Sequence, residues 1–460
     1  MTFLLDTAKL IMLFAFLQRL LSRCIASIST LFWAFISGTP SIEPPPDVEC
    51  GIKGDAQAEP EQDVTASKKA KQEFMASLSR DAIRKLASRY NEYKPCEIFG
   101  EANGSFNACF FVLFPDDGAR WVVRVPIEIE FQQPWEKLQS EVATVKYLRS
   151  ATKIPVPRIH AYGRGEMLAS DKSTTHMFLI SDYIHGKPVM LPELVECEKA
   201  VRSRLLQSIL DILLELRSVE FDRIGSLMPG NSDEEPVVGN LLTFGANAIP
   251  GARLPTFATG QEYMQSQYDM VLQHTAMPCE GLGEETARRE LFAAHSLQKY
   301  FTVPDAVNNG PFVLHHPDLL LGNIIVNEDM EIQGIIDWEF ANVVPLPLFV
   351  PPLWAIGSDS VWLASYFWSE ITYGILRGDR YQTFRKEWDR LNPDILATMY
   401  IAQIMRHPTD LCSVFRRFSA QHLFGNDVDQ AESDFFEANE ALAAEARRRA
   451  MINGTTDVPI

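Results

Sequence analysis

The sequence lacks several features that would place it in a specialised class of proteins. Its seven cysteines are scattered and include no Cys-x-x-Cys pair, so zinc and dithiol redox sites lack support. Scattered thiols fit a reducing compartment, and we expect a cytoplasmic protein. Clustered Lys and Arg with interleaved aromatics are also missing, and 42 basic residues face 60 acidic ones, a net charge of -18. Nucleic acid is therefore not an expected partner, because binding a phosphate backbone requires clustered positive charge.

The chain also lacks an apolar run long enough to span a bilayer. Residues 1–37 are strongly apolar, but their two runs, 10–17 and 24–37, fall short of the roughly 20 residues that a span requires. Asp6 and the missing small-residue cleavage motif argue against a secretory signal. Three interpretations stay open: a helix that contacts a membrane, a mitochondrial signal, and a misassigned start. A membrane-associated or mitochondrial location therefore remains an alternative to the cytoplasm.

What the sequence contains is an ordinary globular composition in a chain of 460 residues, with 46% hydrophobic and 22% charged residues. This length accommodates two lobes with extensions, and we find no internal repeat. The proline-rich stretch after residue 37 predicts a flexible linker. The boundaries that we predict are an apolar segment 1–37, a linker 38–75, a β-rich lobe 76–184, a helical lobe 185–450 and a tail 451–460.

Hydrophobic periodicity predicts an α+β fold, with strands concentrated in the first half. Ser79 is a typical helix N-cap, and Pro-Asp-Asp-Gly at 115–118 is typical of a turn between two strands. From 184 to about 310 we expect mostly helix. The expected helices are 80–90, 135–150, 205–216 and the region 354–450, and the expected strands are 108–114, 121–125, 177–183, 312–315, 324–326 and 335–336.

One segment combines the residue types that phosphoryl transfer requires. The pattern His-x-Asp-x4-Asn places His316, Asp318 and Asn323 in one stretch, and a predicted hairpin then leads to Asp337. A carboxylate can orient an attacking hydroxyl and take its proton, which we assign to Asp318. The oxygens of Asn323 and Asp337 suit Mg²⁺, and His316 can hydrogen-bond the loop in place.

This segment has two other interpretations. The first is a polar surface loop beside two core strands, and the flanking strands and the following Ile-Ile-Asp-Trp argue against it. The second is a hydrolytic metal site made by His315, His316 and Asp318. Adjacent histidines on a strand point in opposite directions, which argues against both being ligands.

His316-Pro317-Asp318, Asn323 and Ile336-Asp337-Trp338 resemble the catalytic and metal motifs of the aminoglycoside phosphotransferase and choline-kinase-like enzymes, with a fungal branch as the nearest likeness. The resemblance covers about residues 76–360. It implies the protein kinase-like fold, with a small β-rich N-lobe and a large helical C-lobe. It also implies ATP and Mg²⁺ as cofactors and a small-molecule hydroxyl as the phosphate acceptor.

The resemblance extends upstream to residues that would hold the nucleotide. The segment 99–107 is similar to the nucleotide loop of the family, and its Gly104, Ser105, Phe106 and Asn107 are candidates for phosphate contacts.

Arg124 occupies the position of the phosphate-pairing base, where many kinases have Lys. Glu141 on the following helix resembles the glutamate that pairs with this base, and Glu136 is its rival. Ser181 and Tyr183 lie in a stretch that resembles the segment between the lobes, whose backbone meets adenine in this fold.

The acceptor is the part of the function that the sequence specifies least. Residues 190–300 and 354–430 are expected to form its pocket, with Asp359 the best-placed acidic candidate. The acidic runs 233–235 and 284–285 are interpreted as solvated surface rather than as a cation pocket. Because Asp318, Asn323 and Asp337 are all intact, activity is favoured over an inactive binding protein, and Trp-Glu after Asp337 disfavours an atypical protein kinase. ATP and GTP are not distinguished.

Overall fold

The computed structural model describes residues 61–454 except 105, 129–130, 172, 234, 278–281, 350–377 and 392–394. Except for Glu61, all of them belong to one compact unit, Gln62–Ile460. The predictions for 1–37, for the linker up to residue 60, for Ser105, for Asp359 and for the end of the tail lie outside this description. Within it, no helix has the length and apolarity needed to cross a membrane.

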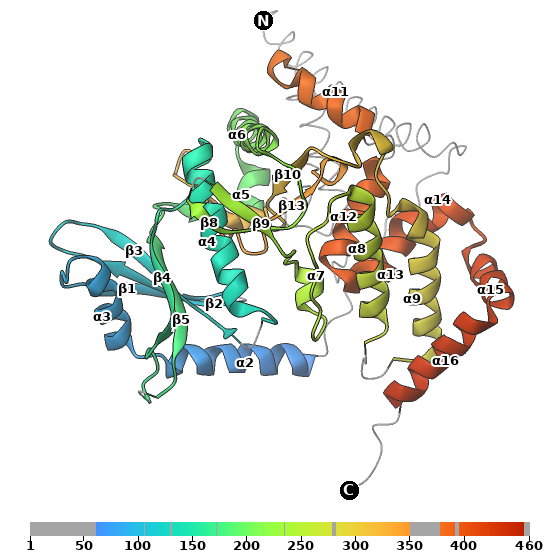
Figure 1. Cartoon of the computed structure of the whole chain (residues 1–460), viewed down its shortest axis with the longest axis horizontal. Helices are drawn as coiled ribbons and strands as arrows, with labels where there is room; N and C mark the ends of the chain where they lie inside the picture. Colours follow the sequence, from blue (N-terminus) through green and yellow to red (C-terminus); the bar gives the residue numbers. More distant parts are fainter. Residues whose placement is uncertain are drawn as a thin grey trace, which may run out of the picture. The chain divides into compact units, whose positions relative to one another are not determined.

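The first part of the unit is a five-stranded antiparallel sheet with strand order β1-β2-β3-β5-β4 (Figure 1). Two helices, α3 (Arg80–Tyr90) and α4 (Pro134–Ala151), pack against it. The strands are β1 (Glu97–Asn103), β2 (Asn107–Leu113), β3 (Arg120–Pro126), β4 (Ile159–Glu166) and β5 (His176–Asp182).

The two helices cover opposite faces of this sheet. On β5, Phe178 and Ile180 join the core cluster that contains Ile83 and Leu86 of α3. The alternate residues Met177 and Leu179 pack with Leu138 and Val142 of α4. Because successive side chains of a strand point to opposite faces, the sheet is buried on both sides. The face covered by α4 also carries the charged residues of the site.

The predicted elements of this lobe are confirmed to within one or two residues. Ser79 caps α3 by accepting a hydrogen bond from the backbone N–H of Ala82 at 3.3 Å. The turn at 115–118 joins β2 to β3.

The predicted linker is wrong at its end, because α2 occupies Glu61–Ser77. This stretch contains no Gly or Pro and is rich in Glu, Gln, Ala and Lys. These residues favour helix even without apolar periodicity. Phe74 and Met75 pack against the core of the sheet, so this helix is attached to the folded body.

The second part of the unit is helical, as predicted, and surrounds a large apolar core. The prediction of mostly helix up to 310 is wrong at the antiparallel hairpin β8–β9. Pro229, Gly230 and Pro236 disfavour helix there, and the adjacent Val237 and Val238 favour strand.

The helices of this part are α5 (Leu191–Glu196), α6 (Lys199–Arg217), α7 (Phe244–Asn247), α8 (Gly260–Thr275), α9 (Glu284–Leu297), α11 (Gln382–Leu391), α12 (Ile395–Arg406), α13 (Leu411–Val414), α14 (Ala420–Phe424), α15 (Val428–Ala438) and α16 (Glu440–Gly454). Its strands are β6 (Lys187–Pro188), β7 (Glu220–Phe221), β8 (Ser226–Ser232), β9 (Glu235–Gly239), β10 (Phe312–His315), β11 (Ile324–Val326), β12 (Ile332–Ile335) and β13 (Asn342–Pro345).

Two short sheets hold the segment with the His-x-Asp-x4-Asn pattern. β10 lies between β13 and β7, and β11 lies between β12 and β6. Ile324 pairs with Ile335, and the N–H of Ile336 donates to the carbonyl of Asn323 at 3.0 Å. The predicted hairpin is therefore confirmed, and it brings Asn323 and Asp337 into adjoining positions.

Candidate active site

His316 holds the loop between β10 and β11 in shape, as predicted. Its side chain is buried, and its Nδ1 accepts the backbone N–H of Asp318 at 3.1 Å. Its Nε2 lies 3.1 Å from the carbonyl oxygen of Ile336, to which it can donate. Burial lowers the pKa of His316 to about 4, so the ring is neutral and each nitrogen has one defined role.

Asp318 is the third residue of this loop, and both of its carboxylate oxygens are engaged. Asn323 Nδ2 donates to Oδ2 at 3.1 Å and to the backbone oxygen of Asp318 at 2.7 Å. Oδ1 forms an ion pair with Arg406, the last residue of α12. The Asp318 side chain is only 20% exposed. The loop thus presents one carboxylate whose orientation is set by an amide and a guanidinium.

Asp337 lies two residues after the end of strand β12, and its backbone is in the left-handed region, with φ 64°. Asp tolerates this region better than most residues, and such conformations cluster at functional sites. The buried Trp338 anchors the turn by donating from Nε1 to the carbonyl of Ile335 at 3.1 Å. The Asp337 carboxylate lies 3.5 Å from Arg124 and is 36% exposed, more than the neighbouring Glu141 or Glu339.

The predicted ion pair between Arg124 and Glu141 is present. Cys109 and Leu179 flank Arg124 on β2 and β5, so its side chain rises from the middle of the sheet. Glu141 is 2% exposed, whereas the rival Glu136 is an exposed residue of α4. The partner of Arg124 is therefore Glu141 rather than Glu136.

Sequence reasoning missed a second buried ion pair, between Lys137 and Glu339. Each is 2% exposed, and Glu339 also pairs with Arg124 and accepts a hydrogen bond from Asn107 Nδ2. Burial alone would raise the pKa of Glu339, but the two cations outweigh it and lower that pKa. The available signals were the spacing of Lys137 four residues before Glu141 on one helix face, and the position of Glu339 two residues after Asp337.

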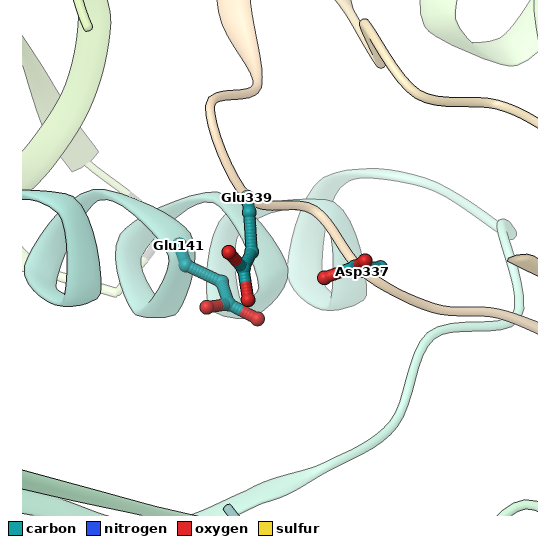
Figure 2. Close-up of side chains that lie close together, drawn as sticks. All are labelled: Glu141, Asp337 and Glu339. Atoms are coloured by element: carbon teal, nitrogen blue, oxygen red, sulfur yellow. The ribbon is translucent and has the colours of Figure 1, made fainter. Parts of the chain in front are cut away.

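Three carboxylates meet beside these cations, as Figure 2 shows for Glu141 on α4 and for Asp337 and Glu339 on the loop after β12. Each offers an oxygen, and these atoms lie within 4.8 Å of one another. Arg124 and Lys137 already neutralise the two glutamates. Burial and the nearby Glu339 raise the pKa of Asp337. Of the three carboxylates, Asp337 is therefore the one whose negative charge the neighbouring cations compensate least.

These donors fit a magnesium ion. Asp337 supplies the more exposed carboxylate, and Asn323 donates from Nδ2 to Asp318, which leaves its Oδ1 as the atom a cation would take. Oxygen donors of this kind are the ones that Mg²⁺ prefers in nucleotide sites.

The loop between β1 and β2 lies against the second part of the unit. Gly104 N–H donates to the carbonyl of Asn107 at 2.9 Å and closes the loop. The Phe106 ring lies 5.2 Å from that of Phe131 and 6.4 Å from that of Phe340. Through Phe106 and Asn107 this predicted nucleotide loop contacts the same 337–340 segment that carries the carboxylates.

The two residues predicted for the segment between the lobes lie at the end of β5. Ser181 is buried and pairs with Val122 in the sheet. The Tyr183 ring lies 5.4 Å from each of the rings of Phe99 and Phe111. Phe99 is 44% exposed, so a partly open aromatic surface borders this segment, and such a surface suits a nucleobase.

The described acidic residues Asp233, Glu235, Glu284 and Glu285 are exposed. Asp233 is exposed and pairs with Lys146 of α4 at 3.0 Å. Glu284 and Glu285 begin α9, are exposed, and complement the positive end of its helix dipole.

The structure thus has the predicted α+β class, with a small β-rich part and a large helical part as in the protein kinase-like fold. The sheet carries a buried Arg–Glu pair, and the helical part carries the His-held Asp and the hairpin-linked Asn and Asp. The comparison with known families agrees. The model of the phosphotransferase enzyme family matches residues 102–346, and the chain belongs to this family.

Individual relatives are more distant. "Clavilactone A biosynthesis cluster protein Y" of Ampulloclitocybe clavipes is 27% identical over 261 residues, 53% of this chain and 61% of that protein. "Altered inheritance of mitochondria protein 9, mitochondrial" of Clavispora lusitaniae is 32% identical over 115 residues, 23% of this chain and 18% of that protein. The chain thus matches less than two thirds of the length of these curated relatives.

Solved structures with a similar arrangement include a putative aminoglycoside phosphotransferase of Ralstonia eutropha, with 13% identity and a TM-score of 0.44. That match covers 81% of this chain and 98% of the other. An ethanolamine kinase of Plasmodium vivax has 12% identity and a TM-score of 0.42, over 73% of this chain and 82% of the other.

Proposed function

We propose that this protein transfers the γ-phosphate of ATP, with Mg²⁺, to a hydroxyl group of a small molecule. The observation that carries the proposal is a continuous set of contacts from Asp318 to Arg124. Asn323 joins Asp318 to the hairpin, the hairpin leads to Asp337, and Asp337 lies 3.5 Å from the Arg124 that pairs with Glu141.

In this proposal Asp318 is the catalytic base. The acceptor hydroxyl oxygen forms a bond to the γ-phosphorus, the bond from that phosphorus to the β–γ bridging oxygen breaks, and ADP leaves. The hydroxyl proton passes to Asp318 and then to solvent. His316 and Asn323 keep the carboxylate oriented during the reaction, because both bond to the loop that carries it.

Arg124 is placed to pair with the phosphates of the nucleotide. Its guanidinium rises from the sheet between Glu141 and the 337–339 segment, with 15% of the side chain exposed. A guanidinium binds phosphate oxygens in a bidentate manner and stays charged at any physiological pH. When bound, Mg²⁺ held by Asp337 and Asn323 would neutralise charge on the β- and γ-phosphates.

Lys137 allows Arg124 to turn towards phosphate. If Arg124 leaves Glu339, that buried carboxylate keeps Lys137 and Asn107 as partners. Without them the departure would leave an uncompensated buried charge, which is strongly unfavourable. We therefore assign Lys137 a positioning role in the nucleotide site.

The test is a screen of metabolite extracts with γ-labelled ATP, comparing the wild type with Asp318→Ala. We expect labelled products with the wild type alone, and Mg²⁺-dependent ATP binding in both. Because one relative is named for a biosynthesis cluster, the extracts should include secondary metabolites. Equal labelling by the two proteins would refute the assignment of the base, and labelling of added proteins only would favour a protein kinase. ATP binding without any labelled product would favour the inactive binding protein.

A further inference from the structure

Arg406 comes from a distant part of the chain and reaches the catalytic carboxylate. It is the last residue of α12 and forms an ion pair with Asp318 Oδ1, 88 residues earlier. Its side chain is 15% exposed, and its guanidinium carbon lies 5.8 Å from the centre of the Phe244 ring. Neither the family motifs nor the proposed mechanism gives this arginine a role.

The ion pair occupies a position that the acceptor hydroxyl needs. Asn323 uses Asp318 Oδ2 and Arg406 uses Oδ1. A base must turn at least one oxygen towards the hydroxyl from which it takes a proton. Asn323 also binds the backbone of Asp318 within the same loop. Arg406 belongs to a separate helix, so it is the partner that can withdraw without unfolding the loop.

Arg406 cannot withdraw without another anion. Its Nε is buried and has no hydrogen-bond partner within the described residues. Among the described residues, Asp410 is the other carboxylate whose charge acts on it, and Asp410 Oδ2 accepts a hydrogen bond from Gln403 at 3.0 Å. The nearby His315 and His316 are kept neutral by burial. A largely buried guanidinium that loses its counter-ion is unfavourable, so an incoming oxyanion would compensate its charge when the carboxylate leaves.

We propose that Arg406 binds an oxyanion in the transfer complex and so releases Asp318 to act as base. The inference rests on the proposed function. The oxyanion is either an acidic group of the acceptor or the terminal phosphate of the nucleotide, since both would meet at Asp318. A guanidinium fork matches carboxylate and phosphate alike. It repels an ammonium group, so acceptors with a cation next to the reactive hydroxyl are disfavoured.

The experiment compares the wild type with Arg406→Gln and Arg406→Lys, with Arg448→Gln as the matched control. Arg448 is an exposed arginine on α16 that pairs with Glu445 of the same helix. Thermal shifts are measured with inorganic phosphate, with Mg–ADP, with Mg–ATP, and with glycerate, glycerol 3-phosphate, ethanolamine and choline. Steady-state kinetics follow for whichever acceptor the labelled screen identifies.

Two outcomes support the inference and distinguish the source of the oxyanion. If it is the acceptor, Arg406→Gln raises the KM of an acidic acceptor about 10- to 100-fold and leaves the KM of ATP within about twofold. If it is the nucleotide, kcat falls about 10- to 100-fold and the variant no longer distinguishes Mg–ATP from Mg–ADP in the thermal shift. Arg406→Lys should recover part of either loss because it keeps the charge.

Other outcomes overturn it. One is that Arg406→Gln matches Arg448→Gln in every shift and kinetic constant. Another is that Arg406→Gln turns over faster than the wild type. A third is that the wild type phosphorylates the hydroxyl only of acceptors that carry an ammonium group, such as ethanolamine. Failure of the proposed function is recognised separately. The wild type would then form no labelled product, while loss of the phosphate-induced shift in Arg406→Gln alone would still support oxyanion binding. Equal phosphate shifts in both proteins would reject that binding too.

Discussion

At the scale of single residues, the chemistry depends on how each charged group is compensated. Glu141 and Glu339 are both buried and both contact cations, whereas Asp337 is the more exposed carboxylate and its nearest cation, Arg124, is shared with them. The acidic residues therefore differ in their surroundings: the two glutamates are paired with cations, which suits the catalytic and metal-binding roles that we propose for the aspartates.

The buried pair of Lys137 and Glu339 gives a prediction about stability. Lys137→Met removes one of the two cations at Glu339 and should lower the free energy of unfolding by about 3 kcal/mol. The double variant Lys137→Met/Glu339→Gln should recover part of this loss. Urea denaturation measures both.

Lys146→Met is the matched control on the same helix. Its partner Asp233 is 63% exposed, so the cost should stay below about 1 kcal/mol. Equal losses in the Lys137 and Lys146 variants would contradict the importance assigned to the buried pair.

His316 gives a prediction about pH. Its pKa is lowered from 6.5 to about 4 in the folded protein, so the unfolded chain binds a proton in this range that the folded protein does not. Its contribution to stability is complete above pH 6.5 and is lost as the pH falls towards 4. The stability difference between wild type and His316→Gln should therefore shrink over this range, by up to about 1.4 kcal/mol per pH unit.

Urea denaturation at several pH values checks this prediction. His422→Gln, at an exposed position of α14, controls for the loss of a histidine elsewhere. A difference between wild type and His316→Gln that stays constant from pH 7 to pH 4 would show that the ring is not kept neutral by burial.

At the scale of elements, helix α4 is the main connection between the sheet and the catalytic segment. One face packs on β5 through Leu138 and Val142, and the same helix carries Lys137 and Glu141. Residues three and four positions apart share a helix face, so apolar packing fixes the rotation of the helix and thereby aims both charged side chains at the 337–339 loop.

The segment between β5 and β6 packs closely against β11 and requires a glycine. Gly186 has φ 137°, and a Cβ there would lie 2.3 Å from the carbonyl oxygen of Val326. Gly186→Ala should therefore destabilise the protein by about 3 kcal/mol, through backbone strain and the clash together.

Gly118→Ala separates the two causes. Gly118 also has a positive φ, 71°, but no atom lies within 4 Å of the added Cβ. Its cost should be about 1 kcal/mol, from strain alone. Thermal and urea unfolding of both variants provide the comparison, and equal costs would mean that β11 can shift to relieve the clash.

At the scale of the whole described unit, the sheet and the helical part meet at one segment. Asn107, Arg124 and Lys137 all contact Glu339, and Phe106 packs with Phe340. A nucleotide bound beside Arg124 would touch both parts at this segment. Binding should therefore stabilise the unit as a whole.

Mg–ATP at about 100 times its Kd should raise the free energy of unfolding by about 2.7 kcal/mol. The same nucleotide with EDTA, or Mg–ATP with Asp337→Ala, should give much less, because the carboxylate assigned to the metal is then unused. Thermal shift measures all three. An equal shift with and without Mg²⁺ would contradict the assignment of Asp337 as a metal ligand.

Much of this molecule could be predicted from local patterns. The helix that begins after Ser79, the turn at 115–118 and the strands around the His-x-Asp-x4-Asn loop follow from capping, turn chemistry and periodicity. Helix α2 and the hairpin β8–β9 could not be predicted in this way. The sequence of α2 lacks an apolar stripe, and the hairpin follows a long helical stretch. Family resemblance, rather than periodicity, led to the pairing of Arg124 with Glu141.

The sequence by itself determined which residue types carry the chemistry and which segments form helix or strand, because these properties depend on neighbours within a few positions. Only the tertiary structure decided which charges meet. Glu339 reaches Arg124 across 215 positions and Arg406 reaches Asp318 across 88. Such pairs have no local signal, because the partner of a buried charge is set by how distant elements pack around it.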